Sequence, residues 1–411
     1  MTLILGKVMI ASTVVVAVLD AISKPTIERY LRMGEAHLPH LTRLGLGNVI
    51  SGEFKSRFEA PDHLDTAFAC DLKSTWADSV MGHRELLGFI DPTNYDLFRD
   101  GFPADYVAKL SRIVGRPLLF NKRCGGDDAI AWNHDEHVRT PGSVILYASM
   151  CDPIAQFAAW EERVPHTELA DIGRIGFDLS QEMGLKVTRT ISRPYVVKEG
   201  KYVRTTNRKD AVIKLPAGVE LFVDVARSRG VYCVSVGKCA DVVNTMWDVD
   251  QKLPEALSQD FKAFLADKND KNPFSLYGAL SVLSQRRDLP LFLMVNFPDT
   301  DSVYGHNRNV SGALRSLEAF DRSIPLLEAA LPQKSLLIIT GDHGMVDGGD
   351  YGYHGREPVF ALGLGKGLRI ADEFGTPEKR GTYAAVGQLC ARAFGFEKEY
   401  IERCRLESIL R

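Results

Sequence analysis

The sequence predicts an α/β fold in which a mainly parallel β-sheet is flanked by helices and an α+β cap domain is inserted into the chain. Short apolar runs rich in β-branched residues predict buried strands, and segments of helical periodicity lie between them. A basic and polar middle section, where the pattern of strands ending in acids disappears, predicts the cap. The runs are TVVVAVLD ending at Asp20, GSVILYAS ending at Ser149, GVYCVSVGK ending at Lys238, PLFLMVNFPDTD ending at Asp301 and SLLIITGDHG ending at Gly344.

The first apolar run, residues 9–19, follows Lys7 and stops at Asp20. It has the length of the apolar region of a signal peptide but is too short to span a bilayer. Its valine content and the acid at its end favour a buried parallel strand that ends in a functional carboxylate. Because functional groups gather beyond the carboxyl ends of parallel strands, we expect Asp20, Asp301 and Asp342 at one edge of the sheet.

The chain of 411 residues is long enough for two or three domains. We expect residues 1–92 and 216–411 to form a metal-binding core in two parts, and residues 93–215 to form the inserted cap. In the second core part, apolar residues recur at spacings of three and four over residues 313–331, which predicts a helix. The densest basic motif, SRPYVVKEGKYVRTTNRKD, lies in the predicted cap.

Composition and charge exclude several classes of protein. Hydrophobic residues make up 45% and charged residues 25%, as is typical of a soluble globular protein. The net charge of −3 provides no basic field for a nucleic-acid backbone, so no nucleic-acid or membrane partner is expected. Seven cysteines without a C-x-x-C pair indicate reduced thiols and a cytoplasmic protein.

Acidic and histidine side chains gather in three short motifs close to strand ends. Asp301 and His306 lie in D-T-D-S-V-Y-G-H, Asp342 and His343 lie in T-G-D-H-G, and His354 follows in G-Y-H-G-R-E. A single histidine of this kind is more often a hydrogen-bonded loop residue, but the whole set favours metal binding. Mixed oxygen and nitrogen ligands suit Mn²⁺ or Zn²⁺, and Mg²⁺ less well. We therefore expect a centre of two divalent ions, with Mn²⁺ as the first choice.

Ser79 is the candidate nucleophile. It follows an acid and precedes an apolar stretch in W-A-D-S-V-M-G-H-R-E-L-L-G, which can place it at the N-terminus of a helix, where backbone N–H groups favour a bound phosphate. Contact with a metal ion would lower the pKa of its hydroxyl, and attack on phosphorus would give a phosphoserine. Without the neighbouring ligands, a plain helix-capping serine would be the better interpretation.

Together these motifs resemble those of the phosphopentomutases of the alkaline phosphatase superfamily. The resemblance covers almost the whole chain and implies an alkaline-phosphatase-like core. The matching motifs are D-S-V-M-G-H-R-E-L-L-G, F-N-K, Y-A-S-M-C-D-P-I-A-Q-F-A-A-W-E-E, R-P-Y, R-T-T-N-R-K-D, V-G-K, D-S-V-Y-G-H-N-R and T-G-D-H-G.

The resemblance also implies roles for individual residues. One ion would be held by Asp20, Asp342 and His343, the other by Asp301, His306 and His354, with Ser79 bridging them as the phosphorylated nucleophile. The cap acid that faces the sugar hydroxyls would be Asp152, and the distal phosphate would be held by Arg193, Arg204, Arg208 and Lys238. Arginine suits this task because its planar fork pairs with two phosphate oxygens at once.

Several positions depart from the family pattern. Ser79 stands where the family usually has threonine, which keeps the hydroxyl and removes a methyl group. Met81, Arg84 and Met150 replace a threonine, a tryptophan and a small polar residue, and alter the wall of the pocket. The glycines of the family's first motif are absent after Asp20. These changes indicate a divergent member of the family.

The resemblance implies a metal-dependent phosphomutase that interconverts ribose 1-phosphate and ribose 5-phosphate, or related pentose phosphates, through a phosphoserine enzyme. A sugar bisphosphate would serve as activator. One alternative is a phosphatase or phosphodiesterase of the same superfamily, in which water discharges the phosphoserine; a cap that excludes water favours transfer instead. The first residues of the serine motif are also similar to those of cofactor-independent phosphoglycerate mutases. A non-catalytic metal-bound scaffold is the third alternative.

Overall fold

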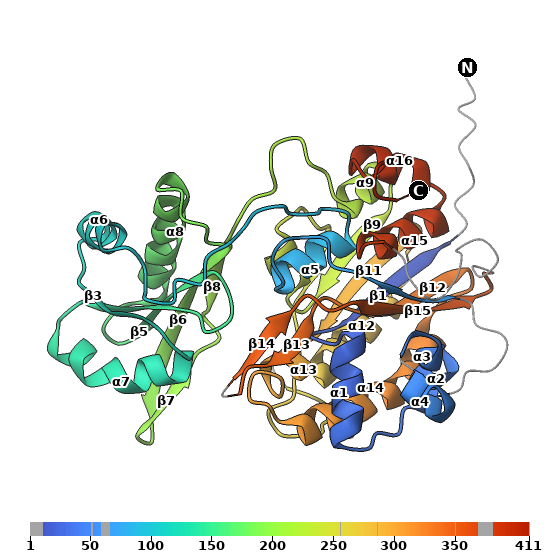
Figure 1. Cartoon of the computed structure of the whole chain (residues 1–411), viewed down its shortest axis with the longest axis horizontal. Helices are drawn as coiled ribbons and strands as arrows, with labels where there is room; N and C mark the ends of the chain where they lie inside the picture. Colours follow the sequence, from blue (N-terminus) through green and yellow to red (C-terminus); the bar gives the residue numbers. More distant parts are fainter. Residues whose placement is uncertain are drawn as a thin grey trace. The chain divides into compact units, whose positions relative to one another are not determined.

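The chain divides into two units, residues 1–92 with 215–411 and residues 93–214 (Figure 1). The computed structural model describes residues 11–50, 52–58, 66–254, 256–285, 287–349, 351–368 and 381–410. Met9 and Ile10, which begin the first apolar run, lie outside these residues.

The first unit is built on a seven-stranded sheet with the order β10-β9-β11-β1-β12-β15-β2. The strands from β10 to β12 pair in parallel, whereas β15 pairs antiparallel with both β12 and β2. This mainly parallel sheet confirms the predicted α/β class. The strands are β1 (Thr13–Leu19), β2 (Thr66–Cys70), β9 (Tyr232–Val236), β10 (Val249–Gln251), β11 (Leu291–Phe297), β12 (Ser335–Gly341) and β15 (Val359–Lys366).

The central strand β1 explains how the sheet positions a site. All seven of its residues are buried, as expected of an apolar strand with layers of helices on both faces. Its last residue, Leu19, pairs with Phe297 of β11 on one side and with Gly341 of β12 on the other. Because the three parallel strands end at the same level, the residues that follow them meet at one edge of the sheet.

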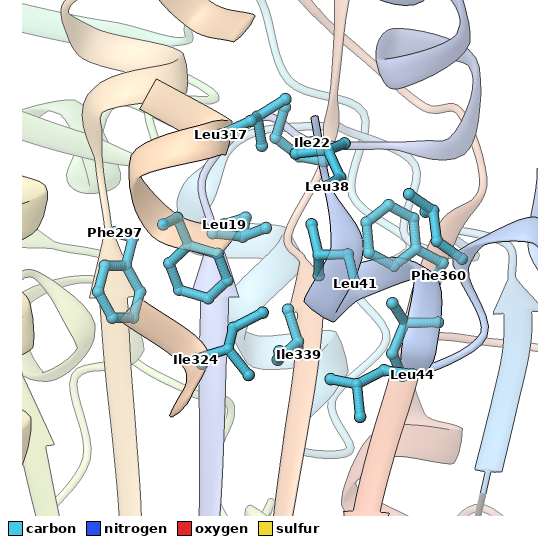
Figure 2. Packing of buried hydrophobic residues seen from close by; sticks show 14 of the residues in the cluster. Leu19, Ile22, Leu38, Leu41, Leu44, Phe297, Leu317, Ile324, Ile339 and Phe360 are labelled. Atoms are coloured by element: carbon cyan, nitrogen blue, oxygen red, sulfur yellow. The ribbon is translucent and has the colours of Figure 1, made fainter. Parts of the chain in front are cut away.

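Helices cover both faces of this sheet (Figure 1). On one face, α14 contacts α1, α2 and α12, and on the other, α15 contacts α5, α9 and α16. The first face is filled by a large apolar cluster that includes Leu19, Phe297, Ile324 and Ile339 (Figure 2). The helices of the first layer are α1 (Lys24–Met33), α2 (Pro39–Arg43), α3 (Leu46–Val49), α12 (Asn272–Leu283) and α14 (Val310–Ala330).

The second layer and the connecting segments complete the unit. The second layer contains α5 (Ser79–Leu86), α9 (Phe222–Ser228), α10 (Cys239–Val243), α15 (Ala384–Phe394) and α16 (Glu397–Arg403). The unit also contains four short segments, which contact helices of the first layer: α4 (Gly52–Lys55), the 3₁₀ turn η1 (Ser56–Phe58), α11 (Gln259–Lys262) and α13 (Asp299–Ser302). An antiparallel hairpin of β13 (Gly344–Asp347) and β14 (Gly352–Gly355) follows β12.

The second unit contains a six-stranded mixed sheet with the order β3-β4-β5-β6-β7 and with β8 paired to β6. Its strands are β3 (Leu118–Arg123), β4 (Val144–Ala148), β5 (Ile154–Trp160), β6 (Arg189–Lys198), β7 (Lys201–Arg204) and β8 (Lys209–Val212). Three helices accompany them: α6 (Ala104–Val114), α7 (Gly126–Arg139) and α8 (His166–Glu182). An apolar cluster that includes Tyr106, Phe157 and Leu169 fills the space under α6 and α8.

Most of the predicted elements are present. The helix expected over residues 313–331 is α14, and four of the five apolar runs form strands β1, β9, β11 and β12 of the first sheet. The run ending at Ser149 forms β4, which belongs to the second unit. The two antiparallel strands β2 and β15 were not predicted. Among the described residues, no helix has the length and apolar character needed to cross a membrane.

Candidate active site

Ser79 is the first residue of α5. The preceding Asp78 has an extended backbone and caps the helix, because its side chain accepts a hydrogen bond from the backbone N–H of Met81 at 2.8 Å. Ser79 itself is only 2% exposed. The capped helix therefore fixes a buried hydroxyl at an N-terminus, where the local field favours negative charge.

Gly82 allows α5 to lie against the loop that follows β12. A Cβ atom at this position would lie 1.9 Å from the carbonyl oxygen of Asp342, far closer than any ordinary contact. The absence of a side chain at Gly82 therefore lets the backbone of α5 touch the backbone of Asp342. This close approach brings Ser79 to the end of β12.

Asp20, Asp342 and His343 form the first group of candidate metal ligands. Their ligand atoms all lie within 4.8 Å of one another, and all three side chains are buried. His343 Nε2 lies 3.5 Å from Asp20 Oδ1, 3.6 Å from Asp342 Oδ2 and 3.4 Å from Ser79 Oγ. The backbone N–H of Ala21 donates to Asp342 Oδ1 at 3.0 Å and fixes the orientation of that carboxylate.

Asp301, His306 and His354 lie next to this group. Asp301 Oδ1 is 3.1 Å from His354 Nε2 and 3.4 Å from His306 Nε2. The ligand atoms of Asp301, His354 and His343 also lie within 4.8 Å of one another, so His343 belongs to both groups. His306 is on the outer side, with its Nδ1 2.8 Å from the carbonyl oxygen of Gly352.

Lys238, which the resemblance assigned to the distal phosphate together with the three arginines, lies in this cluster. It immediately precedes α10 at the end of β9, and its Nζ donates a hydrogen bond to Ser79 Oγ at 2.5 Å and forms an ion pair with Asp20. Burial lowers the pKa of Lys238, but the carboxylates of Asp20, Asp342 and Asp301 outweigh burial and raise it. Lys238 is therefore a cation in contact with the candidate nucleophile.

Two acids of the cluster, Asp342 and Asp301, are held in their ionised form. Burial would raise the pKa of Asp342, but His343, His83 and Lys238 together hold it well below its usual range. Burial would likewise raise the pKa of Asp301, but His306 and His354 lower it further than burial raises it. Ionised carboxylates are the form that binds a divalent cation.

The donor set fits divalent metal ions. Among the described residues, Asp20 Oδ1 and Asp342 Oδ2 accept no well-aligned hydrogen bond, although both atoms are buried. His343 and His306 direct Nδ1 at the carbonyl oxygens of Gly344 and Gly352, which leaves Nε2 of each imidazole for a ligand. Buried carboxylate oxygens without donors and imidazoles oriented by backbone carbonyls are what a metal site requires.

The three predicted arginines all lie in the second unit. Arg193 Nε donates to Gln156 Oε1 at 2.5 Å, and the side chain of Gln156 also accepts from the hydroxyl of Tyr147 at 3.2 Å. Burial, together with the charges of Arg204 and Arg208, lowers the pKa of Arg193 to about 10. The guanidinium groups of Arg204 and Arg208 therefore act electrostatically on that of Arg193.

Carboxylates hold the other two arginines. Arg204 Nη2 lies 2.7 Å from Asp127 Oδ1, and Arg208 binds Asp210 through Nε at 2.7 Å and Nη2 at 2.5 Å. Asp152 lies in the turn between β4 and β5 and is 5% exposed. The unit thus presents a group of positive side chains whose orientation is set by their own partners.

Sequence reasoning missed the contact of Lys238 with Ser79, and it missed His83 and Gln156 altogether. His83 stands four residues after Ser79 on α5, so its helical spacing was a usable signal. The contact of Lys238 had no local signal, because β9 and α5 are far apart in sequence. Gln156 lies in an apolar strand, where a buried amide is a signal for a specific partner.

Comparison with known proteins gives consistent matches. Residues 278–398 match a family model described as "Metalloenzyme superfamily". The phosphopentomutase of Desulfitobacterium hafniense (strain DSM 10664 / DCB-2) is 31% identical over 365 residues, which are 89% of this chain and 87% of that protein. The phosphopentomutase of Thermotoga petrophila is 32% identical over 366 residues, covering 88% of this chain and 87% of the relative.

The solved structures that align with this chain are more distant in sequence. The PH0037 protein from Pyrococcus horikoshii aligns over 93% of this chain and 97% of its own, with a TM-score of 0.46 and 15% identity. The phosphoglycerate mutase of Leishmania mexicana aligns over 94% and 96%, with a TM-score of 0.44 and 13% identity. The level and extent of identity to the curated relatives decide the assignment: the chain belongs to the phosphopentomutase family.

Proposed function

We propose that this protein is a metal-dependent phosphomutase that moves a phosphoryl group between two positions of a pentose phosphate, with ribose 1-phosphate and ribose 5-phosphate as the expected pair. One observation carries the proposal. A buried serine hydroxyl at a helix N-terminus is in contact with a lysine ammonium and lies beside two adjoining sets of carboxylate and imidazole ligands. Family membership supports the same reaction and favours it over the hydrolytic alternative.

Ser79 is proposed as the group that carries the phosphoryl group. In the phosphorylated enzyme, a hydroxyl of the sugar phosphate attacks the phosphorus of phosphoserine 79, and the Ser79 oxygen leaves as a sugar bisphosphate forms. Ser79 Oγ then attacks the other phosphate of the bisphosphate, which releases the isomeric monophosphate and restores the phosphoserine. The Lys238 ammonium and the N-terminus of α5 stabilise the negative charge on Ser79 Oγ in both steps.

The metal ions are proposed to be two Mn²⁺ ions, with Zn²⁺ or Mg²⁺ as alternatives. Asp20, Asp342 and His343 would hold one, and Asp301, His354 and His306 would hold the other. Bound divalent ions polarise phosphoryl oxygens and lower the pKa of a coordinated hydroxyl. The mixed carboxylate and imidazole ligands favour Mn²⁺ over Mg²⁺, which prefers oxygen alone.

The second unit is proposed to be the inserted cap, which holds the phosphate distal to the reaction and faces the sugar. Its three arginines, Arg193, Arg204 and Arg208, would bind the phosphate oxygens. Asp152 would accept hydrogen bonds from sugar hydroxyls. Retention of the bisphosphate requires exclusion of water, which distinguishes a mutase from a phosphatase. A sugar bisphosphate is the expected activator, because it can phosphorylate Ser79 directly.

A cytoplasmic location is proposed for the same protein. All seven cysteines are buried, as small apolar residues of the core commonly are, and the net charge of −3 gives no reason to expect nucleic-acid binding.

The test is phosphorylation and turnover of the purified protein with Mn²⁺. We expect ribose 1-phosphate to be converted to ribose 5-phosphate, and mass spectrometry after incubation with a sugar bisphosphate to place one phosphoryl group on Ser79. Ser79→Ala should lose both. Ser311→Ala is a matched control, because Ser311 lies in the first turn of α14 and is exposed. A label on another residue in active protein contradicts the mechanism, and release of free phosphate in place of isomerisation contradicts the mutase.

A further inference from the structure

We propose that His83 is a positioning residue that holds Ser79 and the Asp342 carboxylate in one fixed arrangement through its Nδ1–H group. The proposal rests on the roles given above to Ser79 and to the metal centre. His83 lies on α5, is completely buried, and is not among the candidate metal ligands.

The contacts of Nδ1 define what this histidine holds. Nδ1 lies 2.8 Å from the carbonyl oxygen of Ser79 and 3.2 Å from Asp342 Oδ2. A carbonyl oxygen only accepts hydrogen bonds, so His83 carries a proton on Nδ1, and this proton is directed at Ser79. The same N–H is close enough to the Asp342 carboxylate to attract it electrostatically.

The opposite ring nitrogen is also engaged. His83 Nε2 lies 3.4 Å from Nδ2 of Asn296, which is on β11 and completely buried. An amide N–H donates to Nε2, which selects the tautomer with the proton on Nδ1. Both nitrogens of His83 therefore have protein partners, so this residue acts on the metal centre only through Asp342 and Ser79.

The consequence is a second constraint on the nucleophile. The Asp78 cap holds the start of α5 through the N–H of Met81, whereas His83 holds the carbonyl group of the nucleophilic residue itself. Partners that orient a metal ligand in this way commonly change metal affinity or activity by about 10- to 100-fold when they are removed. His83 should therefore affect turnover and metal affinity rather than binding of the sugar.

Two substitutions separate the Nδ1–H contact from a general packing role. The side-chain amide nitrogen of asparagine occupies nearly the position of Nδ1, so His83→Asn keeps a donor toward Ser79. The amide of glutamine reaches nearly to the position of Nε2, so His83→Gln keeps a polar group toward Asn296 and loses the donor. His137→Gln is the matched control, because His137 is a buried histidine of the second unit whose ring contacts Ser143 and Trp160.

The measurements are Mn²⁺ affinity by competition with a chelating dye, kcat and KM for the pentose phosphate, and thermal unfolding of the metal-free protein. We expect His83→Gln to weaken Mn²⁺ binding and lower kcat by about 10- to 100-fold, with KM changed less than about threefold. His83→Asn and His137→Gln should remain within about threefold of the parent protein in Mn²⁺ affinity.

Two results would overturn the proposal: parental Mn²⁺ affinity in His83→Gln, or a loss in His83→Asn as large as that in His83→Gln. Where His83→Gln does not fold, His83→Asn alone decides, since retained affinity supports the proposal and lost affinity refutes it. Mn²⁺ affinity can be measured without the sugar. If the parent protein has no mutase activity, the proposed function is contradicted, but the Mn²⁺ affinities of the His83 variants still test the role of His83.

Discussion

The contact between Gly82 and Asp342 sets the distance between the nucleophile and the metal ligands, and Gly82→Ala tests this directly. The added methyl carbon would lie 1.9 Å from the carbonyl oxygen of Asp342, where ordinary contacts begin near 3.4 Å. The backbone of α5 must therefore move away from the end of β12 by roughly 1.5 Å, because neither backbone can rotate out of the way. Ser79 would move with it, away from Lys238 and His343.

The expected effect on activity is larger than that on stability. Overpacking costs about 1–3 kcal/mol, and the better helix propensity of alanine returns about 1 kcal/mol, so the net loss of stability is about 0–2 kcal/mol. A displacement of 1 Å at a reacting group costs on the order of 100-fold in rate, which is about 2.7 kcal/mol of transition-state stabilisation. We therefore expect kcat to fall by about 100-fold or more while the protein remains folded at the assay temperature.

The assay is kcat at saturating pentose phosphate and Mn²⁺, with thermal unfolding measured on the same samples. Gly52→Ala is the matched control, because Gly52 is also helical and a Cβ atom there would meet none of the described residues within 4 Å. The control should keep the parental rate. The reasoning is refuted if Gly82→Ala retains more than about a third of the parental kcat, since the close approach would then not position the nucleophile.

Three further predictions follow from the same structure. Removal of metal with a chelator should abolish turnover and lower Tm. Mn²⁺ at 100 times its Kd should restore about 2.7 kcal/mol of stability. An unchanged Tm would contradict a metal centre formed by buried carboxylates. Burial lowers the pKa of His137 to about 4, below its value near 6.5 in the unfolded chain. The folded state therefore keeps this stability above pH 6.5, and the free energy of unfolding falls by up to about 3 kcal/mol as the pH falls toward 4. The ring resonances of His137 should therefore not titrate between pH 7 and 5 in an NMR experiment, and titration near pH 6.5 would contradict this. Arg193→Lys should raise KM by about tenfold or more with kcat nearly unchanged, because lysine lacks the planar fork and the Nε donor to Gln156. An unchanged KM in steady-state kinetics would contradict the proposed role of Arg193 in binding phosphate.

Much of the first unit was predictable because its strands are buried on both faces. Polar and apolar residues do not alternate in the run TVVVAVL. Its valines and the acid that follows it therefore indicate a central parallel strand that ends at a site. The start of α5 at Ser79 was also predictable, because Asp78 is a strong capping residue in front of an apolar stretch. In contrast, β2 and β15 were not predicted; they extend the sheet through antiparallel pairs, β15 with β12 and β2 with β15, and β2 has only five residues although Asp71 follows it directly.

The sequence by itself determined the chemical types at the site: a serine after a helix cap, and acids and histidines directly beyond apolar strands. These are local properties, because capping and strand patterning depend on neighbouring residues. Only the tertiary structure decided which of these groups meet. The parallel register that ends β1, β11 and β12 together brings Asp20, Asp301 and Asp342 to one edge, and the backbone contact at Gly82 adds Ser79. Lys238 and Ser79 are separated by 159 residues in the sequence, which leaves no local signal for their contact, so the fold alone places that ammonium beside the nucleophile.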